Sequence, residues 1–302
     1  MEDMLKKNSL KVWLEAARPR TLFASVSPVL VGWGLAWHDG GFLFLPAILC
    51  LCVALLAQIA SNFANDYFDF KKGADREDRL GPDRAVASGW ITPGAMLIAT
   101  FLTLGLACLC GCFLLFYGGW ILLPVGILMA ITVLAYSAGP FPLAYNGLGD
   151  VCVLLFYGVV PVCFTYFVQV GTFSASAFLL SLAIGFLSIN ILVVNNYRDY
   201  EQDKISRKRT TIVLFGKPYG RAIYLINGAL AGLLTMFVFH ASSLWLFFIA
   251  AAAGYYVMFI NTWQRFVRLE GKALNAILGR TSLLVFLYAL MVSVMLIFSV
   301  CN

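Results

Sequence analysis

Long apolar stretches separated by short polar ones run through almost the whole chain. Nine of these stretches approach the roughly 20 residues that an α-helix needs to cross the hydrocarbon core of a bilayer. They lie at 21–38, 42–64, 94–117, 120–137, 151–170, 177–196, 222–240, 244–261 and 281–300. The pattern therefore predicts an all-α membrane protein with nine transmembrane helices, forming a single domain over residues 1–302.

Charge agrees with this layout. Hydrophobic residues make up 61% of the chain and charged residues only 12%, whereas about a quarter of the residues in a soluble domain are charged. With nine spans, all 21 lysine and arginine residues fall on one face. Such loops stay in the cytoplasm, so we expect a cytoplasmic N-terminus and an outside C-terminus. Residues 1–20, where Val12, Trp13 and Leu14 stand among lysines, are expected to form a segment on the cytoplasmic membrane surface.

Acidic residues gather at two points, each at the end of a long apolar stretch. Nine of the 15 lie in two groups, one beginning at residues 65–69 (NDYFD) and the other at 195–199 (NNYRD). Carboxylates near lipid are costly, which makes them candidates for function. Spacings of three and four residues place side chains on one helix face. The residues so placed are Asn62, Asp66 and Asp69 in the first group, and Asn195, Asp199 and Asp203 in the second.

These side chains offer only oxygen ligands, which favour Mg²⁺ or a similar hard cation. Mg²⁺ binds through a few carboxylates together with substrate phosphates. We therefore expect two helical halves whose cytoplasmic ends face each other over a central cavity open to the cytoplasm. There they would clamp a diphosphate through bridging metal ions. Exposure to solvent explains Glu77, Asp78 and Asp83 equally well, but not the four carboxylates that follow the apolar stretches.

Basic side chains follow both acidic groups and fit the same ligand. Arg20 stands at the mouth of the first expected helix, and Lys72 lies one turn beyond Asp69; Lys204 follows the second group. Anchoring to lipid headgroups is the alternative explanation for any single one of them.

Several motifs follow one another along the chain. They are Arg18-Pro19-Arg20-Thr21, Asn65-Asp66-x-x-Asp69, Lys72-Gly73-Ala74-Asp75, Tyr136-Ser137-Ala138-Gly139-Pro140, Gly147-Leu148-Gly149-Asp150, Asn195-Asn196-Tyr197-Arg198-Asp199 and Asp203. In this order they resemble the UbiA superfamily of intramembrane prenyltransferases, and in particular its 1,4-dihydroxy-2-naphthoate polyprenyltransferases of menaquinone synthesis. Gly73 and Pro140 depart from the hydroxybenzoate branch, which has Asp and Lys there. Asp150 and Arg209 depart from the naphthoate branch, which usually has Glu at the first position and often Lys or Asn at the second.

The resemblance implies Mg²⁺-dependent transfer of a polyprenyl group from its diphosphate to a ring carbon of 1,4-dihydroxy-2-naphthoate. The carboxyl group is lost and demethylmenaquinol is formed. It also implies a bacterial inner (plasma) membrane, with lipid as a partner and no nucleic acid. The implied metal ligands and catalytic residues are Asp66, Asp69, Asp199 and Asp203. The implied substrate-binding residues are Arg20, Asn65, Lys72, Tyr136, Asp150, Asn195, Asn196 and Lys204.

Two alternatives are compatible with the residues. Prenyl transfer to another aromatic or quinoid acceptor would use the same diphosphate site. An ion-coupled secondary transporter would also need paired acidic clusters, but transporters place such groups near the middle of the membrane. Here both clusters lie at helix ends beside basic loops, which favours the enzyme.

Overall fold

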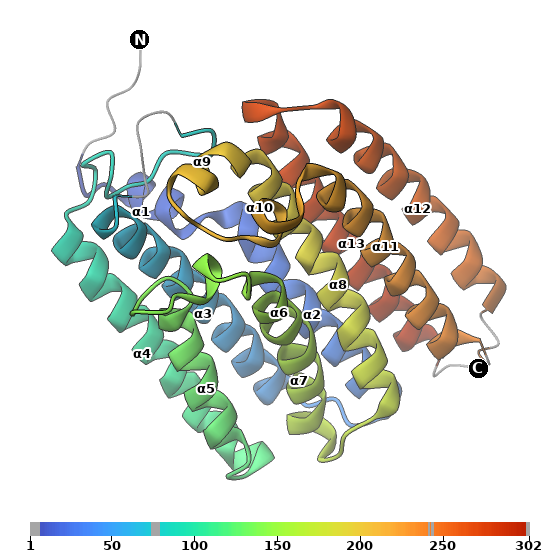
Figure 1. Ribbon diagram of the computed structural model, residues 1–302. Coiled ribbons are helices and arrows are strands. Elements are labelled where there is room, and N and C mark those ends of the chain that lie inside the picture. The colour runs from blue at the N-terminus through green and yellow to red at the C-terminus, as the bar shows by residue number, and fades with distance from the viewer. Residues whose placement is uncertain (1–6, 74–78, 241, 243–244, 300–302) are drawn as a thin grey trace.

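The computed structural model describes residues 7–73, 79–240, 242 and 245–299, all in helices and the loops between them (Figure 1). The helices are α1 Leu10–Ala17, α2 Pro19–His38, α3 Phe44–Lys71, α4 Pro93–Gly118, α5 Leu122–Ala135, η1 Leu143–Tyr145, α6 Gly149–Leu154, η2 Leu155–Val159, α7 Val160–Val170, α8 Ala175–Arg198, α9 Tyr200–Ile205, α10 Thr211–Phe215, α11 Lys217–Phe239, α12 Trp245–Arg268, η3 Gly271–Ala273 and α13 Leu274–Ser299.

Seven of the described helices are long and apolar enough to cross a membrane, and they confirm the expected all-α membrane protein. They are α3, α4, the continuous run Gly149–Val170, α8, α11, α12 and the run Gly271–Ser299. The other two expected spans correspond to α2, with 20 residues, and α5, with 14. At 1.5 Å per residue, α5 is only about 21 Å long.

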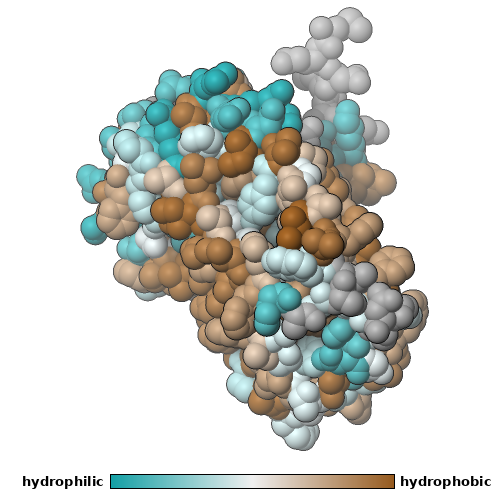
Figure 2. Space-filling model, turned by 90° about the vertical axis from the view of Figure 1, so that its right-hand side faces the viewer, coloured by the Kyte–Doolittle hydropathy of each residue, from teal (hydrophilic) through white to brown (hydrophobic). Residues whose placement is uncertain are grey.

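The long helices form one antiparallel bundle, with α4 and α5 along one side and α11 and α12 along the other (Figure 1). Helix α8 is the most deeply buried of the seven and packs against α11 and α13. Large apolar side chains remain exposed on the flanks, among them Phe116 (85%), Trp120 (78%) and Leu246 (77%). Figure 2 shows hydrophobic residues on the flank and hydrophilic residues gathered at the upper end. Apolar exposure on this scale marks a surface for lipid or protein.

The N-terminal helix α1 differs in part from the expected surface helix, because one of its faces packs against the rest of the protein. Leu10 and Leu14 of α1 are exposed, as an interfacial helix requires, but Val12 and Ala16 are buried. They pack in a small core with Phe63 of α3 and residues of the loop that precedes α4. Helix α1 therefore also helps to hold that loop. Residues 1–6 of the expected segment lie outside the described residues.

A π-helical turn, η2, interrupts the run from α6 to α7. At this turn Gly158 meets Gly185 of α8 so closely that an added Cβ would lie 2.6 Å from the Ser181 carbonyl oxygen. The same Cβ would lie 2.7 Å from the Gly185 Cα. Small residues at such crossings let helix backbones approach in a membrane. The neighbouring backbone leaves no room for a larger side chain.

We expect Gly158→Ala to reduce the free energy of unfolding by about 1–3 kcal/mol, because the added methyl group meets backbone atoms that cannot rotate away. The measurement is the thermal unfolding midpoint of the purified protein in detergent. Gly105→Ala in α4 is the matched control. A Cβ there meets nothing within 4 Å, and alanine is the better helix former by up to about 1 kcal/mol. Equal midpoints for the two variants would contradict the tight crossing.

Candidate active site

A cavity of about 720 Å³ begins between the ends of α3 and α8 that carry the acidic groups. Asp69 and Asn195 lie on its wall at that end, Ala54 and Pro28 lie on its wall in the middle of α3 and α2, and Pro161 lies on it near the start of α7. Along α3 this covers about 22 Å at 1.5 Å per residue. The cavity is thus polar at the mouth and becomes more apolar with depth.

The first acidic group lies on one face of α3, as its spacing predicted. Asn62, Asn65, Asp66 and Asp69 all line the cavity. Asp66 is almost fully buried, and its two carboxylate oxygens accept hydrogen bonds from the backbone N–H groups of Ala85 (3.0 Å) and Val86 (3.2 Å). Asp66 therefore fixes the loop before α4, a role that the sequence did not reveal.

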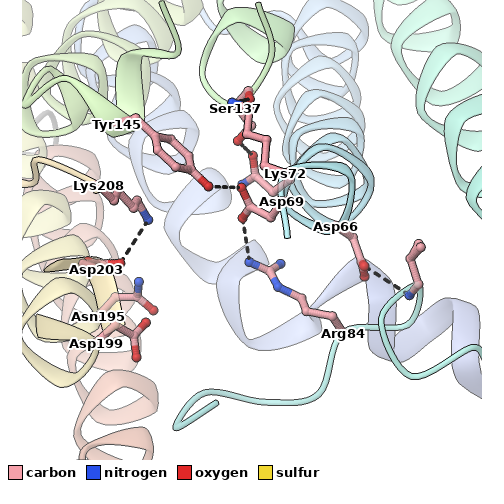
Figure 3. A network of polar contacts seen from close by, with 12 residues as sticks. Asp66, Asp69, Lys72, Arg84, Ser137, Tyr145, Asn195, Asp199, Asp203 and Lys208 are labelled. Carbon is pink, nitrogen blue, oxygen red and sulfur yellow. Dashed lines mark hydrogen bonds and ion pairs between the residues drawn. The ribbon is translucent and has the colours of Figure 1, made fainter. Parts of the chain in front are cut away.

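Asp69 lies at the centre of the mouth (Figure 3). Its Oδ1 accepts a hydrogen bond from the Tyr145 hydroxyl at 3.0 Å, and its Oδ2 pairs with the buried Arg84 guanidinium at 3.4 Å. Asn65, one turn away, accepts a hydrogen bond from Ser137. The loop after α3 and the loop after α5 thus both converge on this helix end.

The second acidic group is held by one buried arginine. Arg198, the last residue of α8, donates from Nε and Nη2 to the two oxygens of Asp199 at 2.7 and 2.6 Å. Its guanidinium also donates to Asn195 Oδ1 (2.8 Å) and Asn275 Oδ1 (2.6 Å). Bidentate pairs of this kind fix geometry as well as charge. Asn275 in turn donates to the Leu80 carbonyl oxygen at 2.9 Å, which ties α13 to the loop after α3.

Asp203, on α9, is buried, and its Oδ2 has no hydrogen-bond partner among the residues that the structure describes. Its Oδ1 lies 3.9 Å from the Lys208 ammonium. Burial raises the pKa of Asp203 to about 6, Lys208 opposes this shift, and Asp199 and Asp69 add to it. Asp69 and Asn195 line the same cavity, and Figure 3 shows the two acidic groups on opposite sides of its mouth.

Two lysines flank the space between the acidic groups. Lys72 donates to the Ser137 carbonyl oxygen at 2.6 Å, and its ammonium lies 4.5 Å from the centre of the Tyr145 ring. Lys208 lies 5.6 Å from the same ring centre, toward the other acidic group. Burial lowers the pKa of Lys72, and the negative charge of Asp69 opposes that shift. Positive side chains therefore accompany the carboxylates on both sides of the mouth.

The donor set at the mouth fits a hard cation that shares its ligands with a substrate. Among the described residues, no three His, Cys, Asp or Glu side chains gather closely enough to hold a metal ion by themselves. Each acidic group contributes two carboxylates. Those of Asp66, Asp69 and Asp199 already contact protein donors at both oxygens. Among the described residues of the two groups, Asp203 keeps the one buried carboxylate oxygen without a partner. The buried, unpartnered Oδ2 of Asp203 is the sort of atom that needs a positive ligand. Mg²⁺ takes its remaining ligands from water and phosphate.

Six predicted residues with described side chains do not line the main cavity. Lys72, Asp199 and Asp203 flank its mouth (Figure 3). The other three are Lys204, Asp150 and Asn196. Lys204 is exposed, with its ammonium 4.0 Å from the centre of the Tyr200 ring. Asp150 accepts a hydrogen bond from Thr211 Oγ1 at 2.8 Å and, with Asn196, lines a water-sized pocket behind Tyr136. Tyr136 lines both the pocket and the main cavity. Arg20 belongs to the first turn of α2, and its side chain lies outside what the structure describes.

The predicted site residues did not include several residues of the mouth. Arg84 and Lys208 belong to the basic side chains that follow the two acidic groups, and Tyr145 is an aromatic residue in the loop after α5. Arg198 stands inside the second motif itself and could have been found there. No local pattern marks Asn275, which α13 brings to the site from far along the chain.

Known proteins share this sequence pattern and fold. The UbiA prenyltransferase family model matches residues 25–290. The 1,4-dihydroxy-2-naphthoate octaprenyltransferase of Escherichia coli is 38% identical over 254 residues, which are 80% of this chain and 82% of that protein. The enzyme of the same name from Mycobacterium tuberculosis is 35% identical over 237 residues, 78% of this chain and 80% of that one.

Solved structures agree in fold at lower identity. A UbiA homolog from Archaeoglobus fulgidus bound to GPP and Mg²⁺ has a TM-score of 0.66 and 18% identity, covering 94% of this chain and 99% of that one. A UbiA homolog from Aeropyrum pernix has a TM-score of 0.65 and 15% identity, covering 91% and 96%. Together with the family model's match to most of its length, these similarities show that the chain belongs to the UbiA prenyltransferase family.

Proposed function

We propose that this protein transfers a polyprenyl group from its diphosphate to a ring carbon of 1,4-dihydroxy-2-naphthoate, with loss of the carboxyl group, to give demethylmenaquinol. One observation carries the proposal: the ends of α3 and α8 bring the two acidic groups to opposite sides of the mouth of a cavity that continues into the apolar interior. A charged diphosphate and a long apolar tail require these two environments side by side. The relatives that bear this activity in their names cover about 80% of the chain.

The carboxylates of Asp66, Asp69, Asp199 and Asp203 are the proposed metal ligands. Bound Mg²⁺ would supply positive charge to stabilise the leaving diphosphate. At the mouth of the cavity, Lys72, Lys208 and Arg84 place positive charge beside the carboxylates and bind the diphosphate oxygens. Arg20 and Lys204 remain proposed contributors from the helix mouth and α9. Such fixed charges act most strongly where water is excluded.

Breakage of the bond between the prenyl carbon and the diphosphate oxygen leaves an allylic cation, which the ring carbon of the acceptor attacks. Aromatic faces stabilise cations, and Tyr136, Tyr145, Phe156 and Tyr157 all line the cavity. The enclosing helices keep water from reacting with the cation. Asn65, Asn195, Asn196, Tyr136 and Asp150 are the proposed contacts for the polar groups of the substrates.

The proposed placement in the membrane follows from the basic loops. Helices α2 and α5 complete nine spans with the seven long apolar helices, and the acidic mouth opens to the cytoplasm. The N-terminus lies on that side and the C-terminus outside. Bacterial relatives support the plasma (inner) membrane as the location.

The test is an assay with purified full-length protein in detergent, Mg²⁺, geranylgeranyl diphosphate and 1,4-dihydroxy-2-naphthoate, read by product mass. We expect a prenylated product that has lost the mass of the carboxyl group. A parallel reaction with 4-hydroxybenzoate should give at least tenfold less product. A prenylated product with 4-hydroxybenzoate but not with 1,4-dihydroxy-2-naphthoate would show that the acceptor is a different aromatic compound. If neither compound gives a prenylated product, the proposed prenyltransferase activity is contradicted.

A further inference from the structure

Tyr145 stands between the two acidic groups. It contacts Asp69 on one side, and on the other its ring lies near Lys208, which pairs with Asp203. It ends the one-turn helix η1, and its backbone carbonyl accepts a hydrogen bond from Arg209 N–H at 3.0 Å. This bond joins the loop after α5 to the loop after α9. The Tyr145 side chain therefore projects into the mouth from a backbone that is fixed on both sides.

The hydroxyl and the ring of Tyr145 have different partners. The hydroxyl donates to Asp69 Oδ1 at 3.0 Å. The ring lies within 4.5 Å of the Lys72 ammonium and 5.6 Å of the Lys208 ammonium, measured to its centre. Figure 3 shows the side chain pointing from η1 toward Asp69, with Lys208 on the side of the second acidic group.

We propose that Tyr145 is a positioning residue for the diphosphate of the prenyl substrate: its hydroxyl orients Asp69 for the metal, and its ring holds Lys72 and Lys208 toward the diphosphate. The inference rests on the proposed function. Beyond that function, it assigns to Tyr145 the positioning of Asp69 and Lys72 at the end of α3 and of Lys208 in the loop after α9.

The physical basis is that the two contacts are of different kinds. A hydrogen bond to a carboxylate fixes the direction of its lone pairs, which decides how well it binds a metal ion. A ring face attracts an ammonium group without removing its three donors. The lysines can therefore rest against Tyr145 and still donate hydrogen bonds to phosphate oxygens.

Two substitutions separate these contacts. Tyr145→Phe keeps the ring and removes the hydroxyl; Tyr145→Leu removes both. We expect Tyr145→Phe to raise the half-saturating Mg²⁺ concentration about fivefold, the usual effect of one hydrogen bond. Its affinity for inorganic pyrophosphate at saturating Mg²⁺ should equal that of the natural protein. Tyr145→Leu should also weaken pyrophosphate binding about tenfold, because two ammonium groups lose their aromatic partner.

Isothermal titration of the full-length protein in detergent with inorganic pyrophosphate, at several Mg²⁺ concentrations, measures both quantities without turnover. Tyr117→Leu, at the far end of α4, is the matched control and should leave both unchanged. Affinities within twofold of the natural protein in both Tyr145 variants would overturn the proposal. So would an equal loss of both affinities in the two variants. Failure of the natural protein to bind magnesium pyrophosphate would contradict the proposed function itself. Normal binding by the natural protein together with unchanged binding by the Tyr145 variants would contradict only the role of Tyr145.

Discussion

Replacing Asp203 by asparagine is expected to lower kcat for prenyl transfer on the order of 1,000-fold, while the helical bundle stays folded. The substitution keeps the shape of the side chain and removes its charge, and the backbone hydrogen bond from Asp203 to Asp199 remains. The lost negative charge is one that would hold the Mg²⁺ that stabilises the departing diphosphate, and losing such stabilisation costs rates of this order. Single-turnover assays with product mass detection give the rate, and circular dichroism gives the helix content.

Glu201→Gln is the matched control, because Glu201 is an exposed carboxylate on the same short helix. It should retain the rate of the natural protein within about twofold. Retention of more than a tenth of the rate by Asp203→Asn at saturating Mg²⁺ would remove Asp203 from the metal site. Asp66→Asn is a poorer probe of the chemistry. Its amide group would face the N–H groups of Ala85 and Val86, so the loop before α4 would lose its anchor as well.

Removal of divalent cations is the second change with a large expected effect. Prenyl transfer should fall to the level of a protein-free reaction in excess EDTA and recover on addition of Mg²⁺, because the charge of the diphosphate cannot be neutralised by lysines and arginines alone. EDTA already saturated with Mg²⁺ is the control and should have no effect. Full activity in EDTA after the protein has been passed over a chelating resin would contradict a metal-dependent site.

A binding readout accompanies this test. A ligand that binds only the folded protein raises its stability, by about 2.7 kcal/mol at a hundred times its Kd. Magnesium and pyrophosphate together should therefore raise the thermal unfolding midpoint in detergent more than either alone. Additive shifts would indicate two independent sites rather than one shared by metal and diphosphate.

For the first acidic group, the arrangement that follows from helical spacing was predictable from the sequence. For the second group the spacing prediction was wrong, because α8 ends at Arg198 and Asp203 lies on the separate helix α9. Asp66 and Asp69 share the cavity face of α3 with Asn62 because residues three and four apart meet on a helix. The apolar stretches likewise predicted the long helices, since spanning a bilayer requires both length and composition. The short length of α5 and the packing of α1 against Phe63 could not be predicted from the sequence, because both depend on tertiary contacts.

The parts that depend on loops meeting helices were not predictable. Arg84 reaches Asp69, and Tyr145 reaches Asp69 and Lys72, only because the loops after α3 and α5 fold over the end of the bundle. The hydrogen bonds that Asp66 accepts from the N–H groups of Ala85 and Val86 also depend on the path of the loop before α4. Such contacts depend on loop conformations, which the periodicity of apolar residues does not predict.

The π-helical turn at η2 has a consequence for how this chain tolerates insertions and deletions. Residues on its two sides, Val153 and Pro161, both line the cavity, as do Phe156 and Tyr157 within it. A π-helical turn holds about one residue more than an α-helical turn. Deleting one residue from 155–159 would therefore let the run continue as a regular α-helix with its flanking segments in register. Such a deletion would change which side chains of the turn reach the cavity, while Asp150 stays beside Thr211.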